Sequence, residues 1–198
     1  MESLTKTCCI GLLAALSLCS ANAVAAPATP GPVAPSASET SGPEADLEID
    51  PTAYALDGYS LHVGVNEHHW RLDLGAFALA VPEFVHGNSD FAVSFHGYGA
   101  KLQYFFGENH AGGFVGMDAG HIRMLAQRKG SDLATTDDSV SVGVHVGYRI
   151  DIFHGFYVKP WIGVSYGFGS EDVTLGGETL EAQPITVFPA IHLGYAFE

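Results

Sequence analysis

Hydrophobic and polar residues alternate along most of this chain with a period of two. Just before Glu198, apolar or aromatic side chains occupy every second position: Ile185, Val187, Pro189, Ile191, Leu193, Tyr195 and Phe197. The positions between them hold Thr186, Phe188, Ala190, His192, Gly194 and Ala196. Because successive side chains of an extended strand leave opposite faces, this pattern predicts a final β-strand with two chemically different faces.

The same alternation predicts six further strands upstream. They are expected within residues 59–65, 70–76, 91–106, 114–121, 140–150 and 156–168. Within 91–106 the apolar phase changes halfway, which predicts a β-bulge near His96-Gly97. The turns after the first, third and fifth of these strands are short. Longer polar loops are expected at 80–91, 127–138 and 169–183, the last with a small hairpin on Gly176-Gly177.

Charge separates the two faces of the predicted strands. One phase is almost all Val, Ile, Leu and aromatic residues. The other holds Gly, Ser, His and almost all strand charges: Arg71, Asp73, Lys101, Asp118, Arg149 and Lys159. A soluble carrier barrel with an apolar interior would then have an outer surface unusually poor in charge. A charge on a lipid-facing surface costs up to ~2–4 kcal/mol at the bilayer midplane. We therefore expect the apolar phase to face lipid and the charges to face the lumen.

The number of strands must be even if they close into a bacterial membrane barrel with both ends on the periplasmic side. Seven strands are clear, so an eighth is expected before Tyr59, at Ala45 to Leu56, closing on an Asp57-Gly58 turn. The sequence thus predicts an all-β, eight-stranded antiparallel transmembrane β-barrel, an up-and-down meander. Outward aromatics gather on its short-turn side as a girdle: Trp70, Tyr104, Phe106, Tyr148, Phe156, Tyr195 and Phe197.

The segment before the barrel has the composition of an exported leader. Residues 1–23, with Lys6 followed by a short apolar run and small residues, are predicted to be a signal peptide, cleaved after residue 23 or as late as 25. All three cysteines of the chain lie in it, so no disulfide is expected after cleavage. Residues 24–44, rich in Pro, Ala and Ser, are predicted to be a disordered linker, and 45–198 the barrel.

The balance of charge limits the partners of the chain. Only 8 residues are Lys or Arg against 22 Asp or Glu, a formal net charge of −14. Nucleic acid is therefore not an expected partner, since phosphate binding needs clustered Lys and Arg. The three long loops are themselves acidic, which favours a solvated rim; bridging to anionic lipid headgroups through divalent cations, or a surface contact site, is the alternative.

The inward bases allow two interpretations. The favoured one is an ion-pair network that plugs the narrow lumen, with Asp73, Asp118 and also Asp46, Glu48 and Asp50 as partners and Trp161 as a lumen aromatic. The alternative is a porin-like conduit or binding pocket for a small hydrophobic or anionic solute.

Neither a metal site nor catalysis is expected from the sequence. A metal site at the short-turn histidines, His68, His69, His110 and His154, would require these side chains to converge, and solvated turn histidines are the favoured interpretation. No cofactor is expected either. A lipid-modifying barrel enzyme, the second alternative function, would need a nucleophile, a base and an orienting group in contact. No motif marks such a set.

The chain ends in His192-Leu193-Gly194-Tyr195-Ala196-Phe197, with Glu198 added after the terminal aromatic. With its leader, Pro-rich linker and alternating strands, it resembles over about residues 45–198 the small eight-stranded outer-membrane proteins, the OmpA/OmpX/OmpW-like barrels of Gram-negative bacteria. The resemblance implies residence in the outer membrane of the cell envelope and insertion by the barrel assembly machinery through the C-terminal strand. We expect a monomer surrounded by outer-membrane lipids, acting as a structural or surface-interaction barrel.

Overall fold

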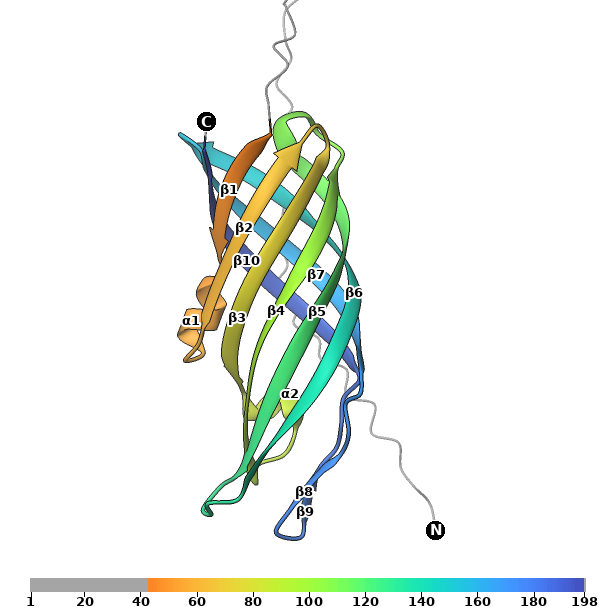
Figure 1. Ribbon diagram of the computed structural model, residues 1–198. Helices are drawn as coiled ribbons and strands as arrows, with labels where there is room; N and C mark the ends of the chain where they lie inside the picture. The colour runs from red at the N-terminus through yellow and green to blue at the C-terminus, as the bar shows by residue number, and fades with distance from the viewer. Residues whose placement is uncertain (1–42, 198) are drawn as a thin grey trace, which may run out of the picture. The chain divides into compact units, whose positions relative to one another are not determined.

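Eight long antiparallel strands form a closed ring in the computed structural model (Figure 1), which describes residues 43–197. The predicted signal peptide and almost all of the predicted linker lie outside the described residues. The ring strands are β1 (Glu44–Ile49), β2 (Tyr59–Glu67), β3 (Trp70–Val81), β4 (Phe91–Phe105), β5 (Gly112–Arg128), β6 (Ala134–Phe153), β7 (Phe156–Phe168) and β10 (Ile185–Phe197).

Each ring strand pairs with its neighbour in sequence, and β1 closes the ring against β10. The closing register places Ala45 opposite Phe197 and Ile49 opposite Leu193. The predicted all-β, eight-stranded antiparallel barrel is therefore confirmed. None of the helices within residues 43–197 is long and apolar enough to cross a bilayer.

The first strand is shorter than predicted. β1 ends at Ile49 and a short helix, α1 (Pro51–Ala55), follows in place of the expected strand. Asp50 caps this helix by accepting a hydrogen bond from the backbone N–H of Thr52 at 2.9 Å, and Pro51 occupies the first helical turn. An Asp followed by Pro is a strong helix start, since proline needs no N–H partner there. The expected turn residue Asp57 does adopt a positive φ of 55°.

The predicted bulge near His96-Gly97 is wrong. The register of β4 runs without a shift against β3 from Tyr104 back to Val93, and against β5 from Phe105 back to Phe91. The phase change arises because Phe91 and Val93 point inward like Gly97, and there they are buried by apolar side chains. With Ala126, Val173 and Leu180 they form a small hydrophobic cluster inside the loop end. The one irregularity in ring pairing recorded for residues 43–197 lies elsewhere, between Asp151 and Phe153 of β6.

The connections at the long-loop end are more ordered than the sequence indicated. β5 and β6 extend so far that only residues 129–133 separate them, which replaces most of the loop predicted at 127–138. The loop at 80–91 contains a helical turn, α2 (Glu83–His86). The predicted hairpin is confirmed as β8 (Val173–Leu175) and β9 (Glu178–Leu180), with positive φ at both Gly176 and Gly177. At the other end a 3₁₀ turn, η1 (Glu108–His110), links β4 to β5.

The outer surface of the ring is apolar between its two ends. Val144 is 63% exposed, Ile162 48% and Leu193 42%, although hydrophobic side chains of this size are usually buried. β7 has 13 residues. At ~3.3 Å per residue it spans about 40 Å, or about 30 Å once tilted by ~40° in a barrel. That length suffices for the apolar band of about 25 Å that such barrels present to lipid.

Aromatic side chains stand at both ends of this apolar surface. The predicted girdle residues at the short-turn end contact one another edge to face, as in Trp70 with Tyr104 (ring centroids 5.0 Å apart) and Phe156 with Tyr195 (4.8 Å). The opposite end carries a second outward set that the sequence analysis did not identify: Tyr98, Tyr166 and Phe168, all exposed. The two sets bound the apolar surface as interfacial aromatics do in membrane barrels.

Candidate functional site

Arg71 lies at the centre of a charged network on the inner face of the ring. It points inward from β3, and its Nε and Nη2 donate to the two carboxylate oxygens of Asp46 on β1, at 2.9 and 2.6 Å. Its Nη1 donates to Gln103 at 3.0 Å and lies 2.8 Å from Asp73. The side chain is 1% exposed. Paired N–H donors on one carboxylate give both strength and fixed geometry.

Glu48 forms a second centre of the network, one inward position along β1 from Asp46. Its Oε1 accepts from the Lys159 ammonium at 2.5 Å and from the Tyr157 hydroxyl at 2.8 Å. Its Oε2 lies 2.7 Å from Nδ1 of His192. Glu48 thereby joins β1 to residues from β7 and β10, and none of its oxygens lacks a partner.

Asp73 and Lys101 extend the network toward the middle of the barrel. Asp73 lies 2.9 Å from Nδ1 of His62 and 3.5 Å from the Lys101 ammonium. Lys101 also approaches the ring of Trp161 on β7, with its Nζ 5.4 Å from the ring centroid. Because β4 and β7 are separated by two strands in the ring, the Lys101–Trp161 contact crosses the lumen.

Gln103 links this network to a separate pair on β5 and β6. Its Oε1 accepts from Lys159 at 3.2 Å, again across the lumen, and its Nε2 lies 3.0 Å from Nε2 of His145. The other ring nitrogen of His145 lies 3.0 Å from Asp118. The side chain of Asp118 is 25% exposed, whereas those of Asp46, Glu48 and Asp73 are almost completely buried.

Small residues on the wall give the large inward side chains their space. The position at which Gly64 would carry a Cβ is occupied by the Arg71 guanidinium and the Asp46 carboxylate. A methyl group on Gly194 would likewise overlap the Tyr157 ring. The inward glycines thus leave room for long side chains from neighbouring strands in a narrow barrel.

The charges in the buried part of the network balance. The cations are Arg71, Lys101 and Lys159, and the carboxylates are Asp46, Glu48 and Asp73. Isolated charges in such a site would be very costly, and the cost is offset only by close pairing and further hydrogen bonds. The geometry of these six side chains meets both conditions.

Arg149 lies apart from the three balanced cations, nearer the short turns. Its Nε donates to Asp151 at 2.9 Å, and its guanidinium stacks 3.8 Å from the centroid of Tyr157. Buried aromatic rings at this end, Phe105 and Phe114, pack 5.0 Å apart between centroids. Arg149 and these rings lie between the charged network and the short turns.

The structure places the predicted lumen residues as follows. Arg71, Asp73, Lys101 and Lys159 lie in one network, with Asp46 and Glu48 as partners. Asp118 and Arg149 make separate pairs, and Trp161 contacts the network from the side. Asp50, expected as a partner, caps α1 instead. The sequence analysis missed the buried polar residues that complete the network: His62, Asn66, Gln103, His145, Tyr157 and His192. All of these residues occupy the inward phase. Their alternation with apolar neighbours was the sequence signal that could have identified them as lumen residues.

The short-turn histidines do not extend the charged network. His69 bonds the carbonyl of Phe105 at 3.0 Å, and His110 packs edge-on against the Phe105 ring. Burial lowers the pKa of His110, and repulsion from Arg149 adds to that effect. Within residues 43–197, no group of three or more His, Cys, Asp and Glu side chains has the arrangement of a metal site.

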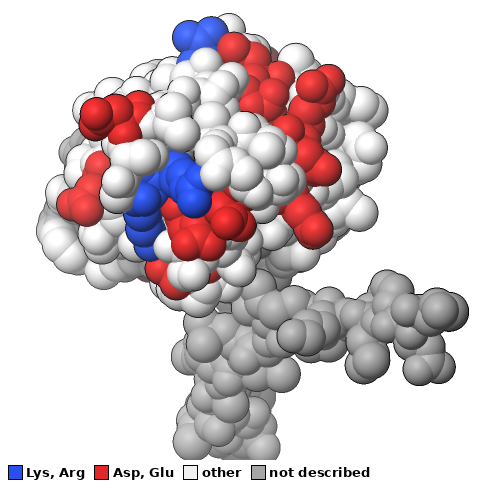
Figure 2. All heavy atoms as spheres, turned by 90° about the horizontal axis from the view of Figure 1, so that it is seen from below, with Lys and Arg blue, Asp and Glu red and all other residues white. Residues whose placement is uncertain are grey.

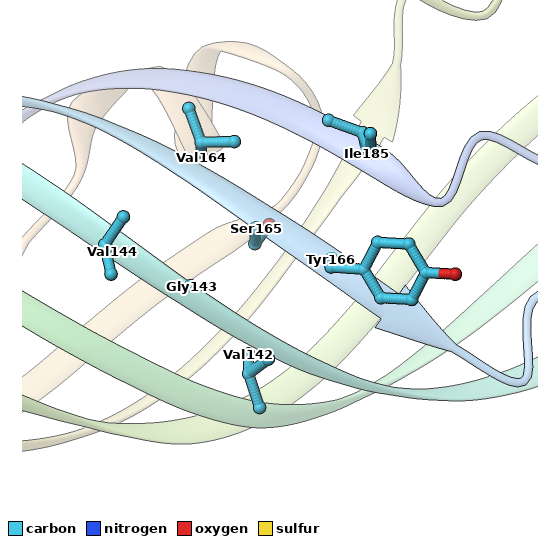
Figure 3. Close-up of a pocket in the computed structure, with 7 residues that line it drawn as sticks. All are labelled: Val142, Gly143, Val144, Val164, Ser165, Tyr166 and Ile185. Carbon is cyan, nitrogen blue, oxygen red and sulfur yellow. The ribbon is translucent and has the colours of Figure 1, made fainter.

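The outer face and the loop end offer two further surfaces. A shallow depression of about 330 Å³ crosses the outer face of β6, β7 and β10 (Figure 3), lined mainly by Val142, Val144, Val164, Tyr166 and Ile185. Seen from the loop end, acidic side chains are spread over the surface and basic ones are few (Figure 2). Lys129 pairs there with Glu83 at 2.8 Å, and the hydrogen bond it donates lowers the pKa of that carboxyl.

A closed eight-stranded ring with an apolar exterior and a charged interior defines the class of small outer-membrane β-barrels. Neither a protein-family model nor a curated protein sequence matches the chain. Among solved structures, the crystal structure of Neisserial surface protein A matches with a TM-score of 0.50 and 11% identity, over 78% of this chain and 94% of that chain. The N-terminal β-barrel domain of Pseudomonas aeruginosa OprF matches with a TM-score of 0.49 and 16% identity, over 78% and 96%. At such identities the first likeness shows the fold alone, that of small eight-stranded outer-membrane barrels.

Proposed function

We propose that this protein is an outer-membrane barrel with a closed lumen, which acts as a structural element or a surface-interaction protein. The observation that carries the proposal is the balanced network around Arg71 and Glu48. Its bonds run from strand to strand around the ring and, at Lys159–Gln103, across it. A solute passing through the barrel would have to break several of these bonds at once.

The membrane location rests on the sidedness of the ring. Large apolar side chains such as Val144 and Ile162 are about half exposed on the outside, whereas Arg71 and Lys159 are buried inside. In water this arrangement would expose a continuous apolar surface around the whole barrel, well beyond the patches that soluble monomers carry. In a bilayer the same apolar surface would contact apolar lipid chains.

Export and assembly follow from the same location. The leader in residues 1–23 would carry the chain across the inner membrane, and the barrel assembly machinery would insert it through the strand ending at Phe197. With the short turns in the periplasm, the long acidic loops would face the outside. They would offer the surface through which the protein meets other molecules.

We assign no catalytic activity. Three lumen histidines touch carboxylates, but no Ser or Thr hydroxyl lies within hydrogen-bonding distance of His62, His145 or His192 in the described part of the chain. Covalent catalysis would need a nucleophile in contact with such a base. A structural pairing explains the three His–carboxylate contacts equally well.

Conductance across planar bilayers tests the closed lumen. The full-length protein, purified folded from outer membranes and added to a planar bilayer, should give no stable conductance steps. Regular steps would contradict the closed lumen and favour the conduit for a small solute. In that case Lys159→Ala and Arg149→Ala should each change the anion–cation selectivity of the steps. The matched variant Lys129→Ala, which removes an exposed base at the loop end, should leave the selectivity unchanged.

A further inference from the structure

Arg123 is the one Lys or Arg between residues 43 and 197 whose side chain leaves a ring strand on the outer face. Four of the others, Arg71, Lys101, Arg149 and Lys159, face the lumen. Arg128 and Lys129 make contacts with loop residues. Arg123 is 48% exposed. An outward base on a membrane barrel is costly unless it lies at the level of the headgroups. The position of Arg123 therefore needs a physical explanation.

Arg123 belongs to an outward cluster on β4, β5 and β6: His96, Tyr98, His121, Arg123 and Asp138. Asp138 accepts from Nε and Nη2 of Arg123 at 2.8 and 3.0 Å. His121 Nε2 lies 3.3 Å from the same carboxylate, and the Tyr98 ring stacks on His121 with centroids 5.5 Å apart. His96 stands directly opposite Arg123 in the β4–β5 register.

The outward cluster lies toward the loop end of the apolar outer surface. On β5 the outward residues nearer the short turns, Val115, Met117 and Ala119, are all apolar, and His121 and Arg123 follow them. In the strand register, His121 stands opposite Val140, which stands opposite Phe168 of the loop-end aromatic set. In a membrane, this is the level at which acyl chains give way to headgroups.

The chemistry of the outward cluster suits a phosphate group. Arginine presents a planar fork of N–H donors that matches phosphate oxygens. Asp138 fixes the plane of the Arg123 guanidinium but uses only Nε and Nη2. Nη1 makes no hydrogen bond within the described part of the chain and stays available to a ligand. His96, His121 and the Tyr98 hydroxyl add further donors beside it, and Asp138 is the single carboxylate among them.

We propose that the outward cluster around Arg123 binds the phosphate of a membrane lipid headgroup. The inference rests on the proposed outer-membrane location, because only a lipid beside the barrel can place its phosphate against an outward side chain at this level. The rest of the loop end is acidic and repels phosphate. The outward cluster would therefore fix which lipid, and in which orientation, lies against β4, β5 and β6.

Native mass spectrometry of the full-length protein in detergent micelles tests this site, with phosphatidic acid and the phosphate-free diacylglycerol of the same acyl chains as probes. Phosphatidic acid should bind about tenfold more tightly than diacylglycerol, because only phosphatidic acid offers phosphate oxygens to the Arg123 guanidinium. Arg123→Gln should abolish that preference, and Asp138→Asn should increase it, since it removes the competing carboxylate. These opposite changes separate ligand binding from a purely structural role of the ion pair. The matched control Lys129→Gln, which breaks another exposed pair at the loop end, should change nothing.

Three results would overturn the proposal. Equal binding of the two lipids by the wild-type protein would show that the outward cluster does not select phosphate. Equal effects of Arg123→Gln and Lys129→Gln would show only a general influence of charge. Complete displacement of phosphatidic acid by an equal concentration of inorganic phosphate would identify a site for a free anion.

Heat-modifiable gel mobility and insertion into vesicles are measured on the same samples. An inserted barrel without lipid preference defeats this inference alone, whereas failure to insert defeats the membrane location and this inference together.

Discussion

Single residues determine whether the buried charges inside this barrel are paired. Arg71 contacts Asp46, Glu48 and Asp73, so one guanidinium links three carboxylates. All of these groups are almost completely buried. Removing one partner from such a set leaves unpaired charges in a low dielectric, which is the costly case for buried ion pairs.

Arg71→Ala is therefore expected to lower the free energy of unfolding by about 3–5 kcal/mol, the typical loss when one member of a buried pair is removed. Equilibrium urea unfolding of the folded barrel in detergent or lipid vesicles measures this value. Arg123→Ala is the matched control, because its guanidinium is exposed and exposed pairs contribute little. Similar losses for the two variants would mean that the network does not hold the ring together.

A titration at the loop end tests the local electrostatics outside the barrel wall. The Lys129 ammonium donates to Glu83, and this lowers the pKa of the carboxyl from its ordinary value of 4.5. A lowered carboxyl pKa means that the Glu83–Lys129 pair stabilises α2 above pH 4.5 and is lost as the pH falls through the lower, folded-state pKa. Lys129→Gln should raise the pKa of Glu83 toward 4.5, as measured by NMR titration of the side chain. An unchanged pKa would show that the pair does not form in solution.

At the residue scale, alternation alone predicted which bases point inward, because period two assigns every second side chain to one face. It could not predict partners. Asp50 shares the inward phase with Asp46 and Glu48, yet the backbone leaves the sheet there and Asp50 caps α1. Asp118 stands opposite Lys101 in the β4–β5 register, yet its side chain contacts His145 on β6. Partners depend on strand stagger, which a single strand's pattern does not contain.

At the scale of elements, the hairpin β8–β9 and the inner face of β4 and β5 form one packed unit. Val173 and Leu180 pack with Phe91, Val93 and Ala126, all of them buried. Arg128 donates to the carbonyls of Leu175 and Gly176, and Asn88 donates to the carbonyl of Thr179. The loop between β7 and β10 is thus held against the loop end by apolar packing and by backbone carbonyls.

Leu180→Ala should release this hairpin without unfolding the ring. Truncating a buried leucine costs about 2–5 kcal/mol, and only a few contacts hold the hairpin. Amide hydrogen exchange at Val173 to Leu180 should rise strongly, while exchange in β6 and β7 stays slow. Leu74→Ala, at a leucine 58% exposed on the outer face of β3, serves as the control. Unchanged exchange in the Leu180 variant would mean that the packing does not hold the hairpin in place.

The errors of sequence analysis at this scale share a cause. Phe91 and Val93 seemed to break phase because an inward apolar side chain was not expected in a polar lumen. The structure gives them a local apolar environment, supplied by a hairpin about 80 residues further along the chain. The same applies to β5 and β6, whose loop-end extensions carry polar residues such as Asp137 and Asp138 and therefore resembled a loop. Long-range packing, not local pattern, decides both cases.

At the scale of the whole molecule, the ring has two faces that suit two different solvents. The closed order of strands leaves no unpaired edge, so every strand can satisfy its backbone hydrogen bonds inside a bilayer. The strand number and the meander could be predicted because short and long connections alternate and a closed barrel needs an even count. Closure also explains why β1, the weakest pattern in the sequence, is required: it pairs with both β2 and β10.

The most direct test asks which side chains touch lipid. Residues 43–197 contain no cysteine, so single cysteines can be introduced and labelled with a fluorophore one at a time. In vesicles that contain brominated lipid, labels at Val144, Ile162 and Leu193 should be strongly quenched. Labels at Ser141 and Ser165, on the inward phase of the same wall, should not be. Absence of quenching at Val144, Ile162 and Leu193 would contradict the account and favour a soluble carrier with an apolar core.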